Sequence, residues 1–382
     1  MSNASTGGLT GMPNSLKLDR RSLVKSCIGA ALGHMLANGL PAYADSEGET
    51  LKTIARRHGI ILGVQVEPAL LQVPELSTFI TENFDLVTPG NQLKWGVLCP
   101  ASSIYNFKDA DSIFRFAQAN QMRVHGHTLC WNQANPGWFT STLTQENARD
   151  YLEAHIRTVG GRYKGQVESW DVVNEPIRAH AKRPDGMTTG PWLDLLGPEY
   201  IDIAFHTAAS VDPSALRVLN LDNTEQAWQG SDSARANSLE LIRNLLHRGV
   251  PIQAVGLQSH LEAPIPVMNS DRTEFIRALK DLGLEILLTE LDVNDTRVQG
   301  SDSERRQVVA SYYGDYLRDV LSVAKPKRVI FWSFCDRYNW YDWAAKRNVL
   351  YARSDGAIHF PGLLTSDMQP APALDAVRNA LR

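Results

Sequence analysis

The sequence predicts an α/β fold in which eight parallel strands alternate with helices and close into a (β/α)8 barrel, the TIM-barrel architecture. Short apolar runs recur along the chain, and segments with apolar residues at helical spacing separate them. Eight such units in about 330 residues favour a closed barrel over an open sheet. Polar and aromatic residues gather at the carboxyl ends of the runs, which is the face where barrel enzymes build their sites.

The strands are expected at eight apolar runs. These runs are residues 60–66, 86–89, 122–128, 167–173, 216–221, 252–258, 285–289 and 328–334. An open, doubly wound sheet is the alternative arrangement of the same elements. Such a sheet normally carries a glycine-rich phosphate-binding turn after its first strand, and the sequence has none there.

Residues 1–44 have the layout of a twin-arginine export signal. A charged segment with the pair Arg20-Arg21 precedes a moderately apolar stretch at 27–40, and the tripeptide 42–44 (Ala-Tyr-Ala) matches the pattern before a signal-peptidase cut. The apolar stretch is too short and too rich in glycine to span a membrane stably. A disordered tail that contains two arginines by chance is the alternative. We expect export, to the periplasm or out of the cell.

The expected mature chain, residues 45–382, is a single catalytic domain with an acidic balance. The full chain has a formal net charge of −4, and loss of four basic residues and one acidic residue with the leader would leave −7. That charge argues against nucleic acids and anionic membranes as partners and is compatible with a neutral polymer. We expect the mature protein to be a monomer that does not associate with a membrane.

Cysteine usage indicates neither a disulfide framework nor a metal centre. The mature chain would keep Cys99, Cys130 and Cys335, an odd number that cannot all pair. The sequence shows no CxxC motif and no His-rich cluster of the kind that binds metals. We therefore expect no metal and no cofactor.

Two glutamates stand directly after apolar runs. Glu175 follows the fourth run, in the segment Trp-Asp-Val-Val-Asn-Glu-Pro, and Glu290 follows the seventh, in Thr-Glu-Leu-Asp. Glycosidic cleavage needs such a pair, because one carboxyl group must be protonated to help the leaving oxygen depart and the other must be ionised to attack the anomeric carbon. A lone glutamate at such a position is more often an ion-pair partner or a neighbour of a helix N-cap, so the surrounding residues decide.

The nine tryptophans are many for this length. Sugar rings present flat faces of C–H bonds, and large aromatic side chains bury such faces well. Trp170, in the fourth run, is expected to pack in the core, whereas Trp332 is compatible with packing or binding. Trp340 is expected in a loop with Tyr338 and Tyr341, exposed and available for binding.

Taken together, these motifs resemble those of the family 10 glycoside hydrolases, which are mostly endo-β-1,4-xylanases. The resemblance runs from about residue 55 to the C-terminus and rests on four motifs in order. The motifs are Trp-Asp-Val-Val-Asn-Glu-Pro at 170–176, Gly-Leu-Gln-Ser-His at 256–260, Thr-Glu-Leu-Asp at 289–292, and the segment 332–340 around Asp336. The resemblance implies endo-acting hydrolysis of β-1,4-xylosidic linkages, with retention by double displacement.

Two other functions remain as alternatives. One is a hydrolase or transglycosylase that acts on another β-linked or decorated glycan. The other is a non-catalytic carbohydrate-binding barrel, and this requires the loss of a catalytic carboxylate. Because both glutamates are present, the sequence argues against the non-catalytic alternative.

The resemblance also implies the roles of the residues that carry the chemistry. Glu175 matches the general acid/base and Glu290 the nucleophile. Asn174 matches the amide that bonds the 2-hydroxyl of the sugar in subsite −1, a contact that tightens at the transition state. His260 matches the imidazole that holds the nucleophile, and Asp292 matches the carboxylate that orients its far nitrogen.

Further matches are expected to bind sugar. Lys94 and His127 match donors to sugar hydroxyls near subsites −1 and −2, and Asn91 belongs to the same motif as Lys94. Gln258 stands beside the histidine of its own motif. The aromatic walls are matched by Trp131, Trp332 and Trp340.

Three segments depart from the family's pattern. Gly90 stands where a Glu precedes Asn91, Asn132 and Ala134 replace a His and a Gln after the third strand, and Asp222 takes the place of a Tyr after the fifth. The first two departures concern subsite −2 and the third concerns the leaving-group side. Because Gly90 and Ala134 offer no side-chain bonds, either binding in subsite −2 is weakened and activity grows with chain length, or the space that they leave admits a substituent on the sugar there. In both cases we expect a preference for long or substituted xylans.

Overall fold

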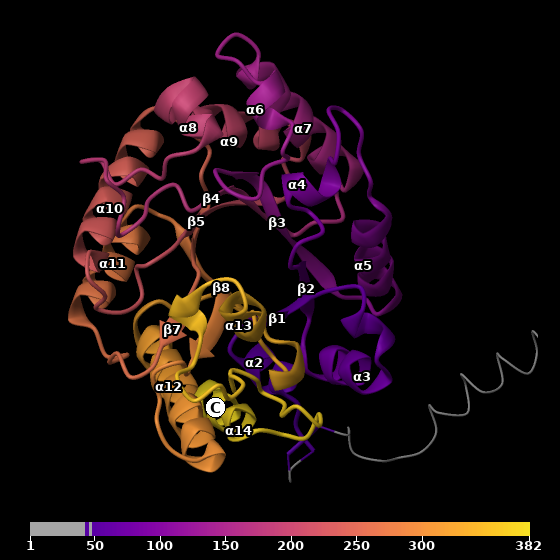
Figure 1. Cartoon of the computed structure of the whole chain (residues 1–382), viewed down its shortest axis with the longest axis vertical. Helices are drawn as coiled ribbons and strands as arrows, with labels where there is room; N and C mark the ends of the chain where they lie inside the picture. Colours follow the sequence, from indigo (N-terminus) through magenta and orange to yellow (C-terminus); the bar gives the residue numbers. More distant parts are fainter. Residues whose placement is uncertain (1–42, 46–47) are drawn as a thin grey trace, which may run out of the picture. The chain divides into compact units, whose positions relative to one another are not determined.

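The barrel strands pair in parallel all the way round. The computed structural model of the chain describes residues 43–45 and 48–382. The strand order is β6-β5-β4-β3-β2-β1-β9-β8-β7, and an additional pairing of β6 with β8 closes the ring. Figure 1 looks into this ring and shows the helices around its outside. The closed (β/α)8 barrel predicted from the sequence is confirmed, and the open sheet is excluded.

All eight predicted runs form strands of the barrel. The barrel strands are β1 (Ile61–Val66), β2 (Leu86–Pro89), β3 (Arg123–Trp131), β4 (Ser169–Asn174), β5 (Leu216–Leu221), β6 (Ala254–Leu257), β8 (Glu285–Asn294) and β9 (Arg328–Phe331). A further short strand, β7 (His260–Glu262), pairs in parallel with the far end of β8.

Helices follow the strands along the chain. The α-helices are α2 (Leu51–Arg57), α3 (Pro74–Asn83), α4 (Trp95–Leu98), α5 (Lys108–Ala119), α6 (Phe139–Thr142), α7 (Ala148–Arg162), α8 (Pro191–Leu196), α9 (Tyr200–Val211), α10 (Ser231–His247), α11 (Ser270–Asp281), α12 (Asp302–Val323), α13 (Trp340–Ala345) and α14 (Pro372–Leu381). Short 3-10 turns are η1 (Leu70–Gln72), η2 (Gly197–Glu199), η3 (Asp336–Tyr338) and η4 (Val349–Tyr351).

Burial explains why these segments take these forms. Strands β2, β4, β6 and β9 are buried at every position. Each strand of such a barrel faces the filled interior on one side and the helices on the other, so it reads as a continuous apolar run. Helix α5 instead buries one stripe, formed by Ala110, Ile113, Phe114 and Ala117, and this spacing places the four side chains on one helical face.

Several strands end at positions other than those predicted, and the differences in β8 and β9 affect the site. Strand β8 continues to Asn294, because β7 pairs with its far end, so Glu290 and Asp292 lie inside the strand. Strand β9 stops at Phe331, and Trp332 follows it. Predicting a loop around Trp340 was wrong, since this residue begins helix α13 and is only partly exposed.

The predicted export signal lies almost entirely outside the described residues, including Arg20 and Arg21. Tyr43, which the prediction assigns to the leader, packs its ring edge-to-face against Phe79, with the centroids 4.9 Å apart. In the part of the chain that is described, no helix combines the length and the apolar character needed to cross a membrane. Cys99, Cys130 and Cys335 are all buried and unpaired.

Candidate active site

Polar side chains from the carboxyl ends of the strands converge at one end of the barrel. Hydrogen bonds join a network of groups contributed by four different strand ends. Its members are Asn174 at the end of β4, Glu175 directly after it, Asn220 in β5, Gln258 after β6, and Thr289 and Glu290 in β8. The predicted residues Asn174, Glu175, Gln258 and Glu290 are therefore brought together. The two glutamates come from different strands, as the chemistry requires.

Glu290 is buried, with 5% of its surface exposed, and is surrounded by donors. Asn220 Nδ2 donates to Oε1 at 2.8 Å, and His260 Nε2 lies 3.3 Å from Oε2. His127 Nδ1 lies 4.0 Å from Oε1. Burial favours the neutral acid, but His127 and His260 outweigh it and hold the pKa of Glu290 below its ordinary value. This carboxyl group is thus prepared to be ionised.

His260 is oriented by a buried carboxylate. Its Nδ1 lies 2.7 Å from Asp292 Oδ1, an oxygen that also accepts a bond from the Tyr341 hydroxyl at 2.6 Å. Ser333 and the Trp340 indole N–H bond the other oxygen, at 3.0 and 2.7 Å. Burial lowers the pKa of His260, but Asp292 and then Glu290 outweigh it and raise the pKa well above the ordinary value. The imidazole is therefore held as a cation between two carboxylates.

Glu175 directly follows β4 and has a left-handed backbone, at φ 50°. Its amide N–H donates to the carbonyl of Asn220 at 2.9 Å, which ties the residue to β5. Oε1 accepts bonds from Gln258 at 3.1 Å and Asn174 at 3.4 Å. Oε2 accepts a bond from Arg178, in the loop three residues further on, at 2.5 Å. Arg178 was not predicted, because its spacing alone does not distinguish it from other loop arginines.

Asn220 is a second site residue that the sequence analysis missed. Its Nδ2 donates to both Glu290 and Asn174 at 2.8 Å, and its Oδ1 accepts a bond from Thr289 at 2.6 Å. A Cβ at Gly256 would lie 2.3 Å from this Oδ1, so only glycine leaves room for the amide. An asparagine inside a buried apolar strand was the signal that could have identified it.

His127 depends on residues deeper in the barrel. Asp171 is fully buried and accepts bonds from His127 Nδ1 at 2.8 Å and His125 Nε2 at 3.0 Å, while Ser169 bonds the other His125 nitrogen. Burial opposes ionisation of Asp171, but the two imidazoles lower its pKa to about 2. The ring of Trp332 lies edge-on to His127, with centroids 5.2 Å apart.

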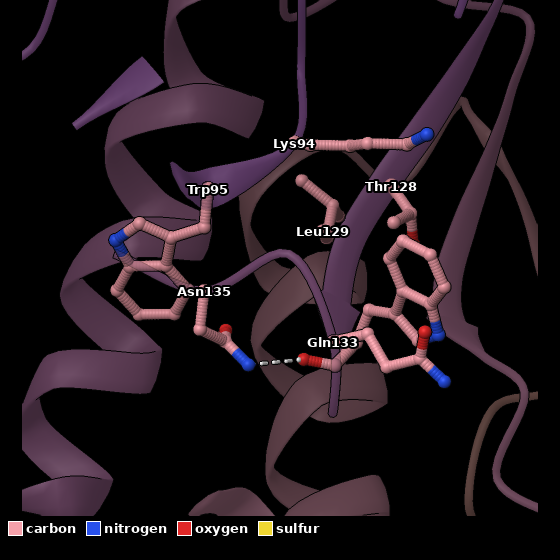
Figure 2. A pocket seen from close by; sticks show the side chains of 7 residues that line it. Lys94, Trp95, Thr128, Leu129, Gln133 and Asn135 are labelled. Carbon is pink, nitrogen blue, oxygen red and sulfur yellow. Dashed lines mark hydrogen bonds between the residues drawn. The ribbon is translucent and has the colours of Figure 1, made fainter. Parts of the chain in front are cut away.

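Lys94 and Asn91, which follow β2, form the neighbouring part of the site. Lys94 Nζ donates to Asn91 Oδ1 at 3.0 Å and lies 5.4 Å from the centre of the Trp131 ring. Burial lowers the pKa of Lys94, although the charges of three glutamates oppose this effect. They are Glu290, Glu175 and Glu67. Figure 2 shows the Lys94 and Gln133 side chains extending to the same side, with Trp95 on the other.

Two polar side chains occupy the space beside Gly90. A Cβ there would lie 2.0 Å from Gln65 Nε2 and 3.0 Å from Glu67 Oε1. Gln65 is the penultimate residue of β1 and Glu67 follows the strand, and Glu67 Oε1 accepts a bond from Asn91 at 2.7 Å. Glu67 is the third glutamate that acts on Lys94. The carboxylate of Glu67, which follows β1, thus lies beside Gly90, where the chain has no side chain of its own. The polar residues Gln65 and Glu67, at and just after the end of the first apolar run, were the sequence signal for this arrangement.

The other departures have distinct structural consequences. Asn132 is buried and joins two loops, since its Nδ2 donates to the Thr188 carbonyl at 3.1 Å and its Oδ1 accepts from the Trp192 amide at 3.2 Å. Ala134 has a left-handed backbone, at φ 49°, and its carbonyl accepts a bond from Gly96. Asp222, by contrast, faces the site through Arg178, whose Nε lies 3.9 Å from its Oδ2.

Within the described residues, no group of three or more His, Cys, Asp or Glu side chains could hold a metal ion. What the arrangement offers instead is a pair of carboxyl groups with unlike surroundings. Glu290 is held by a histidine cation and an amide, while Glu175 is held by two amides and an arginine. Such unlike environments are what a division of acid and nucleophile roles requires.

Comparison with known proteins agrees with this geometry. The sequence model of glycosyl hydrolase family 10 matches residues 50–380. The endo-1,4-beta-xylanase B of Thermotoga neapolitana is 31% identical over 311 residues, which cover 80% of this chain and 87% of that protein. The beta-1,4-xylanase of Dictyoglomus thermophilum is 35% identical over 292 residues, which cover 72% of this chain and 78% of the relative.

Solved structures show the same fold. The crystal structure of xylanase 10B from Thermotoga maritima superposes with a TM-score of 0.76 at 28% identity and covers 87% of this chain and 98% of its own. Xylanase 10B from Thermotoga petrophila, solved in complex with xylobiose, gives a TM-score of 0.75 at 28% identity, with coverage of 87% and 97%. The matched sequence model, the relatives and the barrel all agree, and the chain belongs to glycosyl hydrolase family 10.

Proposed function

We propose that this chain hydrolyses β-1,4-xylosidic linkages inside xylan chains, with net retention of configuration by double displacement. The observation that carries the proposal is the setting of Glu290, a buried carboxyl group that His260, His127 and Asn220 favour in its ionised form. The substrate class is supported by the relatives and solved structures, which are named as xylanases. One of those structures contains xylobiose.

In the proposed first step, Glu290 attacks the anomeric carbon while Glu175 gives its proton to the leaving oxygen. In the second step, Glu175 takes a proton from water, and that water displaces Glu290 from the sugar. Retention requires the two carboxyl groups to lie about 5–5.5 Å apart. Asn174 links the surroundings of the two glutamates. It donates a hydrogen bond to Glu175 and accepts one from Asn220, which also bonds Glu290.

The sugar is proposed to lie between polar and aromatic groups. Lys94 and His127 serve hydroxyl groups, while the partly exposed faces of Trp131 and Trp332 cover C–H surfaces of the rings. Trp340 contributes its ring alone, because its indole N–H is already bonded to Asp292. Two further predicted binding residues, Asn91 and Gln258, bond Lys94 and Glu175 respectively.

Stereochemistry and two variants test the mechanism. Proton NMR of the first-formed product should show the β anomer, and an α anomer would refute retention. Glu290→Ala should abolish turnover on every substrate, because no covalent intermediate forms. Glu175→Ala should be least harmful with leaving groups that need no proton, and azide should partly restore it. Rescue of Glu290→Ala by azide with net retention would instead reverse the two roles.

A product profile separates xylan from other substrates. The chain is given xylan, mixed-linkage glucan and an aryl xylobioside, and internal cleavage of xylan should be fastest. Faster cleavage of the glucan, or transfer products in place of hydrolysis products, would favour the alternative of another glycan or of transglycosylation.

We also propose that residues 1–44 direct export through the twin-arginine route and that the mature monomer begins at Asp45. The motive is the charged segment with Arg20 and Arg21, the apolar stretch and the Ala-Tyr-Ala site. Replacing both arginines by lysine should leave a full-length precursor inside the cell. Export that ignores this change, or a mature N-terminus far from Asp45, would refute the assignment.

A further inference from the structure

Residues 43–45, which precede the first helix of the barrel, are held against two of its outer helices. The ring of Tyr43 packs edge-to-face on Phe79 of α3, with the centroids 4.9 Å apart. The Tyr43 N–H donates to Glu82 Oε2 at 3.3 Å, and Arg378 Nη2 of α14 donates to the Tyr43 carbonyl at 3.2 Å. Helices α3 and α14 both pack against α2, on the same side of the ring in Figure 1. The segment is therefore fastened to two helices that lie far apart in the sequence.

Asp45 is bonded through both its backbone and its side chain. Its N–H donates to the Glu49 carbonyl at 3.1 Å, and its own carbonyl accepts a bond from the Gly48 N–H at 3.0 Å. Its carboxylate accepts a bond from the Glu49 N–H at 2.9 Å and pairs with Arg382. Asp45 and the two residues before it are only partly exposed. The N–H of the peptide bond that joins residue 44 to Asp45 is therefore engaged inside the fold.

The same peptide bond is the expected processing site. The tripeptide 42–44 matches the pattern before a signal-peptidase cut, so the cut falls between Ala44 and Asp45. An extended peptide is bound largely through the hydrogen bonds of its backbone. In the folded chain, the N–H and carbonyl groups of Tyr43 and Asp45 are already bonded elsewhere. A peptidase that meets the folded precursor therefore finds these groups occupied.

We propose that docking of residues 43–45 protects the processing site in the folded precursor, and that the cut waits for local release of this segment. The inference rests on the proposed export signal. Proteins open locally without unfolding as a whole, and such openings expose segments to proteases. When opening and closing are fast relative to the cut, the rate of cleavage follows the population of the open form. Each contact that holds Tyr43 therefore slows processing by the factor with which it favours the docked form.

The cut is a hydrolysis that the peptidase catalyses. Water adds across the peptide bond, which leaves a carboxylate on Ala44 and an amino group on Asp45. Tyr43 departs with the leader, so Phe79 and Arg378 lose the contacts that they make with it in the precursor. The docked form cannot return after the cut, and protection therefore applies to the precursor alone.

The test measures the rate at which a signal peptidase cuts the purified, folded, full-length chain and its variants Tyr43→Ala and Arg378→Met. Tyr43 is the middle residue of the small-x-small pattern, so its replacement removes the ring contact and keeps the two small residues that are recognised. Arg378→Met removes the donor to the Tyr43 carbonyl and changes no residue of the processing site. Each variant should be cut about 5- to 10-fold faster than the wild type, as the loss of one aromatic pair or one hydrogen bond implies.

Two controls separate docking from recognition and from folding. A synthetic peptide of residues 30–50 has no helices to dock on, so it should be cut faster than the folded chain and equally fast with and without Tyr43→Ala. Arg318→Met is the matched arginine control, because Arg318 of α12 pairs with Asp315 at 2.5 Å on the exposed surface. Its processing rate should equal that of the wild type. Thermal melting shows that each variant is folded at the temperature of the assay.

Two results would overturn the protective role. In one, Tyr43→Ala and Arg378→Met are processed at the rate of the wild type. In the other, the folded wild-type chain is cut as fast as the peptide, which means that the site is already open. Failure of the proposed export signal is distinguishable, because the peptide itself would then not be cut before Asp45, and the protective role would fall with the signal.

Discussion

His260 and Asp292 face each other across the ladder between β7 and β8, with Nδ1 and Oδ1 2.7 Å apart. The parallel register pairs these two residues directly, so the backbone itself sets their alignment. The same imidazole reaches Glu290 with its other nitrogen. A three-residue strand thus connects a buried aspartate to the proposed nucleophile.

Asp292→Asn should lower kcat about 10- to 100-fold, because a hydrogen bond to a charged group is worth roughly 1.5–3 kcal/mol. The amide removes the charge that stabilises the His260 cation, and the bond to Glu290 weakens with it. The measurements are kcat and KM on a xylo-oligosaccharide, with thermal melting to show that the variant is folded.

Asp342→Asn is the matched control for this prediction. Asp342 also accepts from a histidine, His359, whose Nδ1 lies 2.6 Å away, but this pair does not bond the proposed catalytic residues. The control should reduce stability and leave kcat near the wild-type value. Equal losses of kcat in both variants would show that the effect of Asp292 is only structural.

The barrel could be predicted from the sequence because each strand is buried on both faces and reads as an apolar run. Strand β7 could not, since three residues are too few for a periodic pattern and its pairing depends on the long-range extension of β8. The loop predicted around Trp340 was wrong for a related reason. Asn339 caps the short helix α13 there by accepting a bond from the Asp342 N–H.

The site was predictable where it follows strand ends and not where it depends on contacts between loops. Glu175 and Glu290 follow or lie in apolar strands, so their position was visible in the sequence. The bond from Arg178 to Glu175 arises from the course of a loop, which no spacing rule describes. Gln65 and Gly90 show the same limit. The side chain of Gln65 fills the space beside Gly90, and neither residue indicates this contact in the sequence.

Acid unfolding should report on Asp171. Its pKa in the folded state, about 2, lies below the ordinary value of about 3.9. The resulting stabilisation, about 2–3 kcal/mol, is therefore complete above about pH 4 and is lost as the pH falls toward 2. Urea unfolding at several pH values should show Asp171→Asn clearly less stable than the wild type near pH 6, with a gap that narrows below pH 4.

Asp185→Asn serves as the control for this measurement, because the Asp185–Arg183 ion pair is exposed and such pairs contribute little. Its stability should follow that of the wild type at every pH. A gap for Asp171→Asn that does not depend on pH would mean that Asp171 stabilises the barrel through packing and not through its charge.

Gly90→Glu should weaken activity on linear xylo-oligosaccharides, although it restores the glutamate of the family's pattern. The new side chain would overlap Gln65 and would place a second negative charge next to Glu67. Adding Gln65→Ala removes the overlap and should recover part of the loss. The measurement is kcat/KM on xylotriose, and a gain with Gly90→Glu alone would show that the space is open after all.

Glu67 should supply the carboxylate that Gly90 lacks, so Glu67→Ala is the most informative variant on this side of the site. Glu67 Oε1 bonds Asn91, and the charge of Glu67 acts on Lys94. Its loss should reduce kcat/KM about 10- to 100-fold on short substrates, as expected for one hydrogen bond to a charged group. Longer substrates should suffer less, because their remote sugars supply binding that does not involve Glu67.

A rescue experiment decides whether the carboxylate itself is what matters. The triple variant Gln65→Ala/Gly90→Glu/Glu67→Ala moves the glutamate from the end of β1 to position 90 without overlap or like-charge repulsion. It should regain most of the kcat/KM that Glu67→Ala loses on xylotriose. Glu75→Ala, an exposed glutamate of α3, should change nothing. If the triple variant stays as poor as Glu67→Ala while melting at the same temperature as the wild type, the two positions are not interchangeable. Glu67 would then act by holding Asn91 and Lys94 in place and not by binding the sugar.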